Sequence, residues 1–218
     1  MKIAIDGPAG AGKSTVARMV ANKMGFVYID TGAMYRALTW KALQQGIDLH
    51  HSQALKDLAQ ATDISFTKAA DTQRVICDGE DVSEAIRSPR INSTVSTVAA
   101  DPMVREIMVE KQQILARVSC VVMDGRDIGE TVLPDADYKF FITASLEERA
   151  HRRLLELEAQ GFTTGLEELR KDIANRDQMD CERPVGALKI LSDAIVIDTS
   201  FLSIDESLRK ILDIIGEI

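Results

Sequence analysis

A run of small residues near the start of the chain ends in a lysine and a hydroxyl residue, a combination that binds phosphate. Residues 7–14 read G-x-x-x-x-G-K-S. Glycines let backbone N–H groups turn inward around phosphate oxygens. The lysine can reach the outer phosphates, and a hydroxyl can face a magnesium ion. We therefore predict a phosphate-binding loop made of Gly7, Pro8, Ala9, Gly10, Ala11, Gly12, Lys13, Ser14 and Thr15.

This loop works only if the flanking elements hold it. Residues 2–6 form an apolar run that predicts a buried strand, and residues 14–24 predict a helix. The positive end of that helix would face the same anion. A glycine-rich turn without a ligand is the alternative. The agreement of strand, spacing and helix favours the phosphate loop.

Two polar clusters follow other predicted strands. In residues 30–36, Thr31 could cap a helix and Arg36 lies one turn further along; alone, this also fits a capped helix with a solvated arginine. In residues 123–129, Asp124 could hold magnesium through water and Arg126 could fork onto phosphate oxygens. The neighbouring carboxylate, Asp127, could accept a hydrogen bond from a sugar or base. A polar turn whose charges pair with one another is the alternative.

A third cluster, residues 176–184, alternates acids with arginines and stops at Pro184, which ends a helix. It is either a mobile lid that closes on phosphates or a solvated charged face. In the first case Arg149, Arg152 and Arg153 would lie near its hinge. The segment 96–105 carries no chemistry that stands out by itself.

The clusters require a scaffold that brings strand ends together. Short apolar runs without polar alternation predict strands covered on both faces at residues 2–6, 26–30, 119–124, 138–142 and 194–198. Helical patterns occupy residues 14–24, 33–45, 103–117, 145–160, 165–176 and 204–215. This alternation predicts a doubly wound α/β fold, whose ligands bind beyond the carboxyl ends of the strands.

Residues 63–88 break this rhythm. Strand-like stretches at 64–67, 74–77 and 80–82 surround Asp78-Gly79, a strong hairpin pair. We predict a small antiparallel sheet inserted at 63–88, extending helically to about residue 100, into a core formed by residues 1–62 and 89–218. A mobile surface loop is the alternative.

Composition limits the partners. The 218 residues include 26 Lys and Arg against 34 Asp and Glu, a net charge of −8, which disfavours nucleic-acid polymers and anionic membranes. No apolar run approaches the ~20 residues that cross a bilayer. The three cysteines show no metal spacing and fit reduced thiols. We expect no signal peptide and a cytoplasmic protein.

Together these residues suit phosphoryl transfer. That reaction needs positioning and neutralisation of charge by lysine, arginine and magnesium, and no protein nucleophile when the acceptor is itself a phosphate. The sequence contains only three histidines and no evident Ser–His–Asp constellation.

The combined motifs resemble the bacterial cytidylate kinase family, within the nucleoside monophosphate kinases. The resemblance runs nearly end to end and rests on residues 5–15, 30–36, 78–82, 124–129 and 176–183. It implies a P-loop nucleoside triphosphate hydrolase-like fold with a five-stranded parallel core, a nucleotide-monophosphate-binding insertion at 63–88 and a lid at about 150–185. It also implies a monomer that transfers the γ-phosphate of ATP to CMP or dCMP with Mg²⁺.

The resemblance further assigns roles to individual residues. Residues 7–15 would bind ATP, and Lys13, Arg126 and Arg176 would be catalytic. The residues that would bind CMP are Thr31, Arg36, Ser96, Arg105, Arg126, Asp127, Arg176, Asp180 and Arg183. Arg149 and Arg153 would belong to the lid. Ser14 or Thr15 would hold Mg²⁺, with Asp124 acting through water.

Other functions stay open at this point. A kinase of the same fold could use UMP, AMP or a hydroxyl acceptor. A regulatory GTPase would need an Asp-x-x-Gly switch after the third core strand and an Asn-Lys-x-Asp motif, and neither is evident. A nucleotide sensor without catalysis would not need Lys13, Arg126 and the arginines of the lid.

Overall fold

The computed structural model describes residues 1–69, 72–117, 119–159 and 161–216. The chain forms two compact units. Unit 1 comprises Met1–Tyr28 and Ser119–Ile218, and unit 2 comprises Ile29–Val118. Each unit contains a sheet of its own with helices packed around it.

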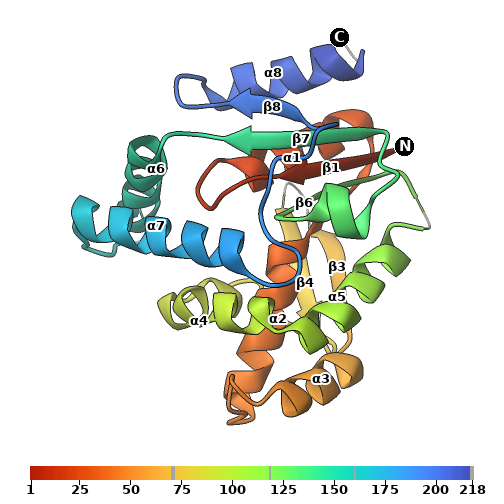
Figure 1. Ribbon diagram of the computed structural model, residues 1–218, viewed down its shortest axis with the longest axis vertical. Coiled ribbons are helices and arrows are strands. Elements are labelled where there is room, and N and C mark those ends of the chain that lie inside the picture. Colours follow the sequence, from red (N-terminus) through yellow and green to blue (C-terminus); the bar gives the residue numbers. More distant parts are fainter. Residues whose placement is uncertain (70–71, 118, 160, 217–218) are drawn as a thin grey trace. The chain divides into compact units, whose positions relative to one another are not determined.

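Unit 1 is organised around a parallel sheet. In the order β2-β6-β1-β7-β8, its strands are β2 (Val27–Asp30), β6 (Val121–Gly125), β1 (Lys2–Asp6), β7 (Tyr138–Thr143) and β8 (Ile195–Asp198). β1 pairs in parallel with both β6 and β7, and β7 pairs in parallel with β8 (Figure 1). The five strands and the doubly wound α/β class predicted from sequence are confirmed. The last two residues of β2 already belong to unit 2.

Helices cover the centre of this sheet more completely than its edges. The helical elements of unit 1 are α1 (Lys13–Met24), the short turn η2 (Ile128–Val132), α6 (Leu146–Ala159), α7 (Leu166–Glu182) and α8 (Ile204–Ile215). Val16 and Val20 of α1 and Ile211 of α8 pack in one core with Ile5 and Phe140. The prediction that every strand is covered on both faces is wrong for the edge strand β8, where Ile195 is 38% and Val196 48% exposed. An edge strand has a neighbour on one side only, so less of it is covered.

Two helices of unit 1 carry the charged segments of the sequence. Figure 1 shows α6 and α7 side by side. The helix α7 continues to Glu182, beyond the predicted end at residue 176, and stops just before Pro184. The charged run 176–182 is therefore helical. Its buried positions include Asp180, which faces the protein rather than solvent.

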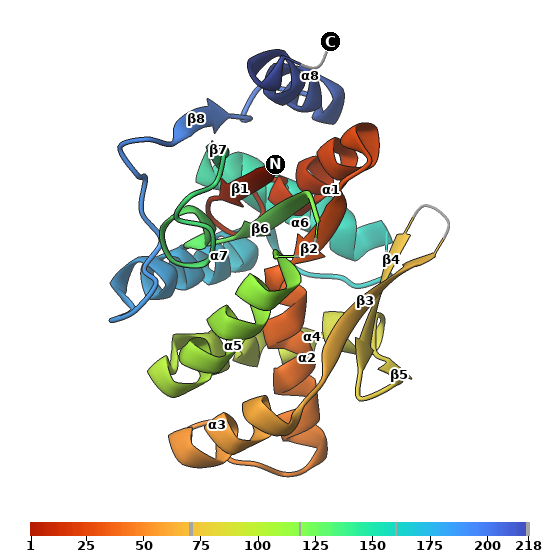
Figure 2. The same cartoon turned by 90° about the vertical axis from the view of Figure 1, so that its right-hand side faces the viewer.

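Unit 2 combines helices with the small sheet. Its elements are α2 (Thr31–Gln44), α3 (Ser52–Ala61), β3 (Ile64–Ala69), β4 (Thr72–Cys77), β5 (Glu80–Asp81), the short turn η1 (Ala85–Arg87), α4 (Pro89–Ala100) and α5 (Pro102–Leu115). The strands pair antiparallel in the order β3-β4-β5 (Figure 2). Asp78 and Gly79 both adopt positive φ, 49° and 86°, as a two-residue hairpin turn requires. The predicted hairpin and antiparallel sheet are confirmed.

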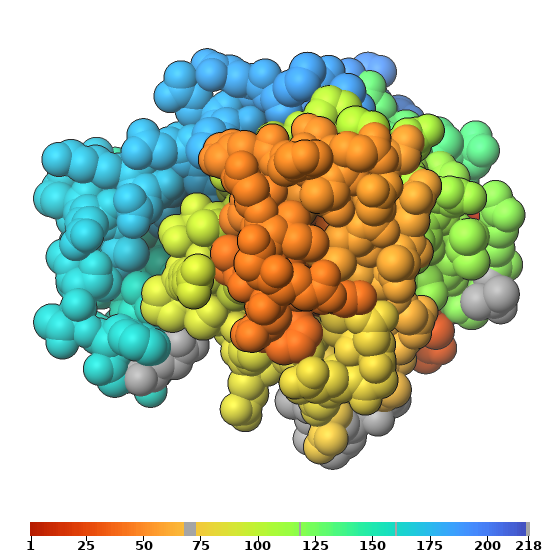
Figure 3. Space-filling view, turned by 90° about the horizontal axis from the view of Figure 1, so that it is seen from below, coloured from red at the N-terminus to blue at the C-terminus, as the bar shows by residue number. Residues whose placement is uncertain are grey.

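The helix α3 has no counterpart in the sequence predictions. It begins after His51, whose ring nitrogen accepts a hydrogen bond from the backbone N–H of Ala54 at 3.1 Å. Leu55 and Leu58 are its buried anchors. In Figure 3 the orange surface comes from the end of α2, the following loop and α3. Histidine is not among the residues preferred as helix caps, which explains why the start of this helix was missed.

The division into two compact units reflects how the chain packs. It does not show which segments bind a nucleotide. The described part of unit 2 contains four α-helices as well as the small sheet. The core at 1–62 and 89–218, the monophosphate-binding role of 63–88 and a lid at about 150–185 stay predictions. Within the described parts of the chain, no helix is long and apolar enough to cross a membrane.

Candidate functional site

The phosphate loop connects β1 to α1 and has a backbone that only glycine accepts at its first position. Gly7 has φ of 146°, and a Cβ placed there would lie 1.9 Å from the carbonyl oxygen of Ile142. Gly12, at the start of α1, has φ of 85° and forms no side-chain cap on the helix. Gly12 has no side chain that could accept hydrogen bonds from the first N–H groups of α1. These N–H groups can therefore donate to a bound anion.

Lys13 is buried at the base of this loop. Its exposure is 5%, and Nζ donates a hydrogen bond to the carbonyl oxygen of Pro8 at 2.6 Å. The pKa of Lys13 is lowered to about 7, mainly by burial and also by the positive charge of Arg126, while Asp124 opposes the shift. Four charged side chains act on Lys13. Asp124 lies on β6 and Arg126 directly after it, and α7 contributes Arg176 and Asp180. Phosphate oxygens would add negative charge beside this buried lysine and so favour its charged form.

Asp124, at the end of β6, receives two hydroxyl groups. Ser14 Oγ donates to Oδ2 at 2.7 Å, and the Tyr28 hydroxyl donates to Oδ1 at 2.8 Å. Asp124 is 4% exposed, and each of its carboxylate oxygens accepts one of these two hydrogen bonds. Tyr28 was not predicted as a site residue. Nothing in its sequence neighbourhood indicates the contact, since it arises from β2 lying beside β6.

These oxygen donors fit a magnesium ion held largely by water and substrate phosphates. Among the described residues, no group of three or more His, Cys, Asp or Glu side chains gathers where it could hold a metal. Mg²⁺ commonly keeps several waters and takes only one or two protein ligands. A hydroxyl at Ser14 next to the carboxylate of Asp124 matches that requirement.

Arg126, directly after β6, is paired with α7. Its Nε donates to Asp180 Oδ2 at 2.5 Å, and Arg183 Nη2 donates to the other oxygen, Oδ1, at 3.0 Å. Burial alone would raise the pKa of Asp180, but the two guanidinium groups outweigh it and lower that pKa. Burial would likewise lower the pKa of Arg126, but Asp180 outweighs it and raises that pKa. One carboxylate thus orients two of the arginines predicted to bind nucleotide.

Two arginines of α6 hold the phosphate loop from outside. Arg149 is 6% exposed and its Nη1 donates to Ala9 O at 3.1 Å and to Asp177 at 2.6 Å. Arg152 Nη2 donates to Thr199 O at 2.7 Å, and its Nη1 donates to Thr199 Oγ1 at 3.1 Å. Arg153, in contrast, pairs with an acid on its own helix, Glu156, at 3.0 Å. Of the two arginines predicted for the lid, the structure therefore brings Arg149 to the loop.

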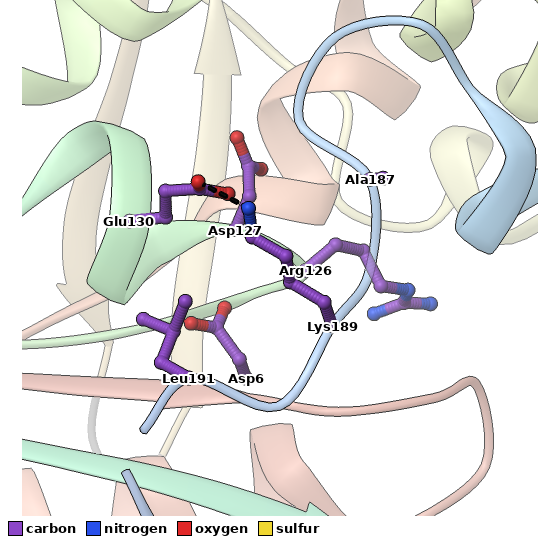
Figure 4. A pocket seen from close by; sticks show the side chains of 7 residues that line it. All are labelled: Asp6, Arg126, Asp127, Glu130, Ala187, Lys189 and Leu191. Atoms are coloured by element: carbon purple, nitrogen blue, oxygen red, sulfur yellow. Dashed lines mark ion pairs between the residues drawn. The ribbon is translucent and has the colours of Figure 1, made fainter. Parts of the chain in front are cut away.

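Asp6 and Asp127 line a small pocket of unit 1 next to Arg126. Figure 4 shows its lining residues, Asp6, Arg126, Asp127, Glu130, Ala187, Lys189 and Leu191. Glu130 and Lys189 form an ion pair across it at 2.5 Å. Asp6 accepts hydrogen bonds from the backbone N–H groups of Ile128 and Gly129. Asp6 was not predicted as a site residue.

In unit 2, the segment after β2 is held by an acid. Asp30 caps α2 by accepting from the N–H of Ala33 at 2.7 Å, and it pairs with Arg36 at 3.0 Å. The suggestion that Thr31 caps this helix is therefore wrong. The helix begins at Thr31, two residues before the predicted start at residue 33, and the side chain of Thr31 is buried.

The second part of unit 2 with predicted site residues is buried around Arg105. Arg105, on α5, is 2% exposed, and its Nη1 donates to the Tyr35 hydroxyl at 3.4 Å. Its guanidinium carbon also lies 5.9 Å from the centre of the Tyr35 ring. Ser96 is half-buried on α4. Tyr35 was missed because an aromatic residue within a helix is more often part of the core.

The structure thus gathers the predicted residues in two sets. In unit 1 the residues near the phosphate loop are Lys13, Ser14, Asp124, Arg126, Arg176, Asp180 and Arg183. In unit 2 they are Thr31 and Arg36 on α2, Ser96 on α4 and Arg105 on α5. The first set combines a buried lysine with arginines, the side chains that were predicted to contact phosphate groups.

Comparison with solved structures shows the fold. An uncharacterized protein from Eubacterium ventriosum aligns with a TM-score of 0.53 at 13% identity, covering 100% of this chain and 99% of that one. A shikimate kinase from Bacteroides thetaiotaomicron aligns with a TM-score of 0.50 at 12% identity, covering 99% and 98%. At such low identity the resemblance concerns the arrangement of the elements alone.

Comparison of sequences is far more specific. The cytidylate kinase of Bacillus cytotoxicus is 53% identical over 217 residues, covering 100% of this chain and 96% of that protein. The cytidylate kinase of Bacillus cereus is 51% identical over 216 residues, covering 99% and 96%. A family model described as cytidylate kinase matches residues 3–217. On this evidence, the chain belongs to the cytidylate kinase family.

Proposed function

We propose that this kinase transfers the γ-phosphate of ATP to CMP or dCMP, giving ADP and CDP or dCDP. The observation that carries the proposal is the cluster around Lys13, in which a buried lysine at the phosphate loop lies within electrostatic reach of Arg126 and Arg176. Membership of the cytidylate kinase family over the full chain supports the choice of reaction. We also propose a monomer that acts in the cytoplasm.

On the donor side, the phosphates of ATP would lie in the loop of residues 7–15. Their oxygens would accept hydrogen bonds from the backbone N–H groups at the start of α1 and charge from Lys13. Ser14 or Thr15 would hold Mg²⁺, and Asp124 would orient a water molecule on it. The ion would neutralise charge on the donor phosphates.

On the acceptor side, arginines would handle the phosphate and carboxylates the sugar. Arg36 and Arg126 would bind the acceptor phosphate, because a guanidinium presents a fork of donors that matches phosphate oxygens. Arg176 would serve the sugar or help to close the site. Asp127 and Asp180 would accept hydrogen bonds from the sugar. When a nucleotide binds, Arg126 would direct some of its hydrogen bonds from Asp180 to the phosphate.

The remaining predicted contacts concern the cytosine ring. We assign them to Ser96, Arg105 and Arg183, with the hydroxyl of Thr31 also at the CMP site. The ring carbonyl and N3 of cytosine accept hydrogen bonds, and arginine and hydroxyl side chains can supply the donors. Uracil carries an N–H at N3, so it would leave a buried donor without its partner, at a cost of about 1–3 kcal/mol. UMP should therefore be a poorer substrate than CMP.

The chemistry would then consist of alignment and neutralisation of charge. The acceptor phosphate is ionised at neutral pH and attacks the γ-phosphorus without a protein base. In the transition state, negative charge develops on the phosphoryl group that passes between the two nucleotides. Lys13, Arg126 and Arg176 would stabilise that charge. Arg149 would keep the phosphate loop in its binding shape through the contact with Ala9.

A coupled assay of ADP release with ATP, Mg²⁺ and a panel of CMP, dCMP, UMP, AMP and GMP tests the proposal. We expect the highest kcat/KM with CMP or dCMP and lower values with UMP. A highest value with AMP or GMP would overturn the assignment of the base. ADP release that is independent of any monophosphate would overturn the assignment of the reaction. Sedimentation of the protein with and without nucleotide tests the monomer.

A further inference from the structure

Asp6 precedes the phosphate loop in the chain, but its hydrogen bonds go elsewhere. It is the last residue of β1 and is 6% exposed. Its Oδ1 accepts from the N–H of Ile128 at 2.8 Å, and its Oδ2 accepts from the N–H of Gly129 at 2.9 Å. Both carboxylate oxygens are thus occupied by consecutive amides that follow β6.

These amides open the turn that carries two of the proposed acceptor contacts. Arg126 and Asp127 directly precede Ile128, where η2 begins. Asp127 itself forms no side-chain cap on η2, so the acceptor for the first amides comes from a different strand. Since Asp6 binds both amides at once, it fixes the direction in which the chain leaves β6. That direction sets where the side chains of Arg126 and Asp127 start.

The surroundings of Asp6 make the ionised form of its carboxyl group energetically unfavourable. The pKa of Asp6 is raised to about 6, mainly by burial and also by the charge of Asp127; the two amides and Lys13 lower it and only partly offset the burial. The other charged side chains that line the same pocket are Arg126 and the pair formed by Glu130 and Lys189 (Figure 4). Local packing therefore does not account for an acid at position 6. Two acceptor oxygens for two adjacent amides do account for it.

We propose that Asp6 is a positioning residue for the acceptor nucleotide, which holds the turn that carries Arg126 and Asp127. This inference rests on the proposed function, because it takes that turn to contact the monophosphate. The proposed role of Asp6 therefore differs from the role that its position in the sequence suggests. A residue next to the ATP loop would govern affinity for CMP.

The test is Asp6→Asn, which keeps the shape and one acceptor oxygen but presents an NH₂ group to one of the two amides. Calorimetric titration should show the Kd for CMP rising about tenfold, the loss expected for one buried hydrogen bond to a backbone amide. The Kd for ATP, measured in the same preparation, should stay within about twofold of the wild type. The amide resonances of Ile128 and Gly129 should shift in the NMR spectrum.

The matched control is Asp137→Asn. Asp137 accepts from the N–H of Lys2 at 2.6 Å, so it bonds the opposite end of the same strand through the same kind of contact. It should leave both Kd values unchanged. An unchanged Kd for CMP in Asp6→Asn, or equal losses for CMP and ATP, would overturn the inference.

A measurement on the unaltered protein covers the case in which Asp6→Asn does not fold. CMP should slow hydrogen exchange at the Ile128 and Gly129 amides more than ATP does. Equal protection by both nucleotides would contradict the positioning role. These outcomes differ from a failure of the proposed function, in which the wild-type protein would not phosphorylate CMP or dCMP at all.

Discussion

Asp180 on α7 holds Arg126 at the end of β6, with Nε of the arginine 2.5 Å from Oδ2 of the acid. The other oxygen, Oδ1, is held by Arg183. This carboxylate is therefore the point at which a helix of the charged segment is joined to the sheet of unit 1. It has a structural role that can be measured apart from any role in binding nucleotide.

Replacement of Asp180 by alanine should destabilise the fold strongly. The side chains of Asp180 and Arg126 are 8% and 17% exposed, and removal of the acid takes away the main compensating charge of a buried arginine. Such losses cost about 3–5 kcal/mol of unfolding free energy. Urea denaturation measures it. Asp193→Ala is the control: the side chain of Asp193, which pairs with Lys139, is 59% exposed, so its loss should cost far less than the loss of Asp180. Equal losses would mean that the buried pair has no special role.

Replacement of Lys13 by alanine should abolish most of the turnover without loss of stability. A single charge stabiliser in such a site contributes about 2.7–4 kcal/mol to the barrier, which corresponds to a fall in kcat of about 100- to 1000-fold. Because burial lowers the pKa of Lys13, its removal also relieves the cost of burying its charge. Steady-state kinetics and thermal unfolding test the two parts.

The control for this change is Lys23→Ala, which removes an exposed lysine from the same helix. It should leave kcat near the wild-type value. If Lys13→Ala kept near-wild-type turnover, the phosphate-loop assignment would be wrong.

Replacement of Tyr28 by phenylalanine should weaken the response to magnesium. It removes the hydroxyl that donates to Asp124 Oδ1 and leaves the ring in place. Asp124 then keeps Ser14 as a hydroxyl partner, and its orientation is less fixed. We expect the gain in ADP affinity on adding Mg²⁺ to fall about fivefold, as for loss of one hydrogen bond of about 1 kcal/mol. Calorimetric titration with and without the ion provides the measurement.

Tyr138→Phe serves as the comparison for this change. Its hydroxyl donates to Ile215 O at 3.4 Å, outside the phosphate site. It should leave the magnesium response unchanged. A response in Tyr28→Phe that matches the wild type would remove Tyr28 from the site.

The pH dependence of stability should reveal the buried acid at position 6. Burial raises the pKa of Asp6 to about 6 from an ordinary value of 3.8. The folded state therefore binds a proton more readily than the unfolded state, so this group's contribution is greatest below pH 4 and is lost as the pH rises through 6. The loss amounts to about 3 kcal/mol at most.

Asp6→Asn cannot ionise, so it should not show this loss. Urea denaturation at steps between pH 4 and 7 should give a difference between the two proteins that changes by up to ~3 kcal/mol in favour of the variant. Parallel curves for the variant and the wild type would show that Asp6 does not titrate in this range. The lowered pKa of Asp180 acts below this window and is common to both proteins.

Much of the fold follows from local sequence. The strand at Lys2–Asp6 and the helix at Ile204–Ile215 have the bounds that their apolar patterns predict. The turn at Asp78 and Gly79 forms because that pair adopts positive φ at low cost. The phosphate loop is also local, since its glycines, lysine and helix start are consecutive in the chain. In each case, neighbours within a few residues determine the conformation.

The tertiary structure decided the partners of the charged groups. Ser14 meets Asp124 across 110 positions of sequence, and Asp6 meets Ile128 across 122. Those meetings depend on the order of the strands, with β1 beside β6 and β6 beside β2. Short apolar strands resemble one another in sequence, so their patterns do not encode which neighbour each one takes. The long-range pairing of the strands sets that order, and the order brings Asp6 to Ile128 and Tyr28 to Asp124.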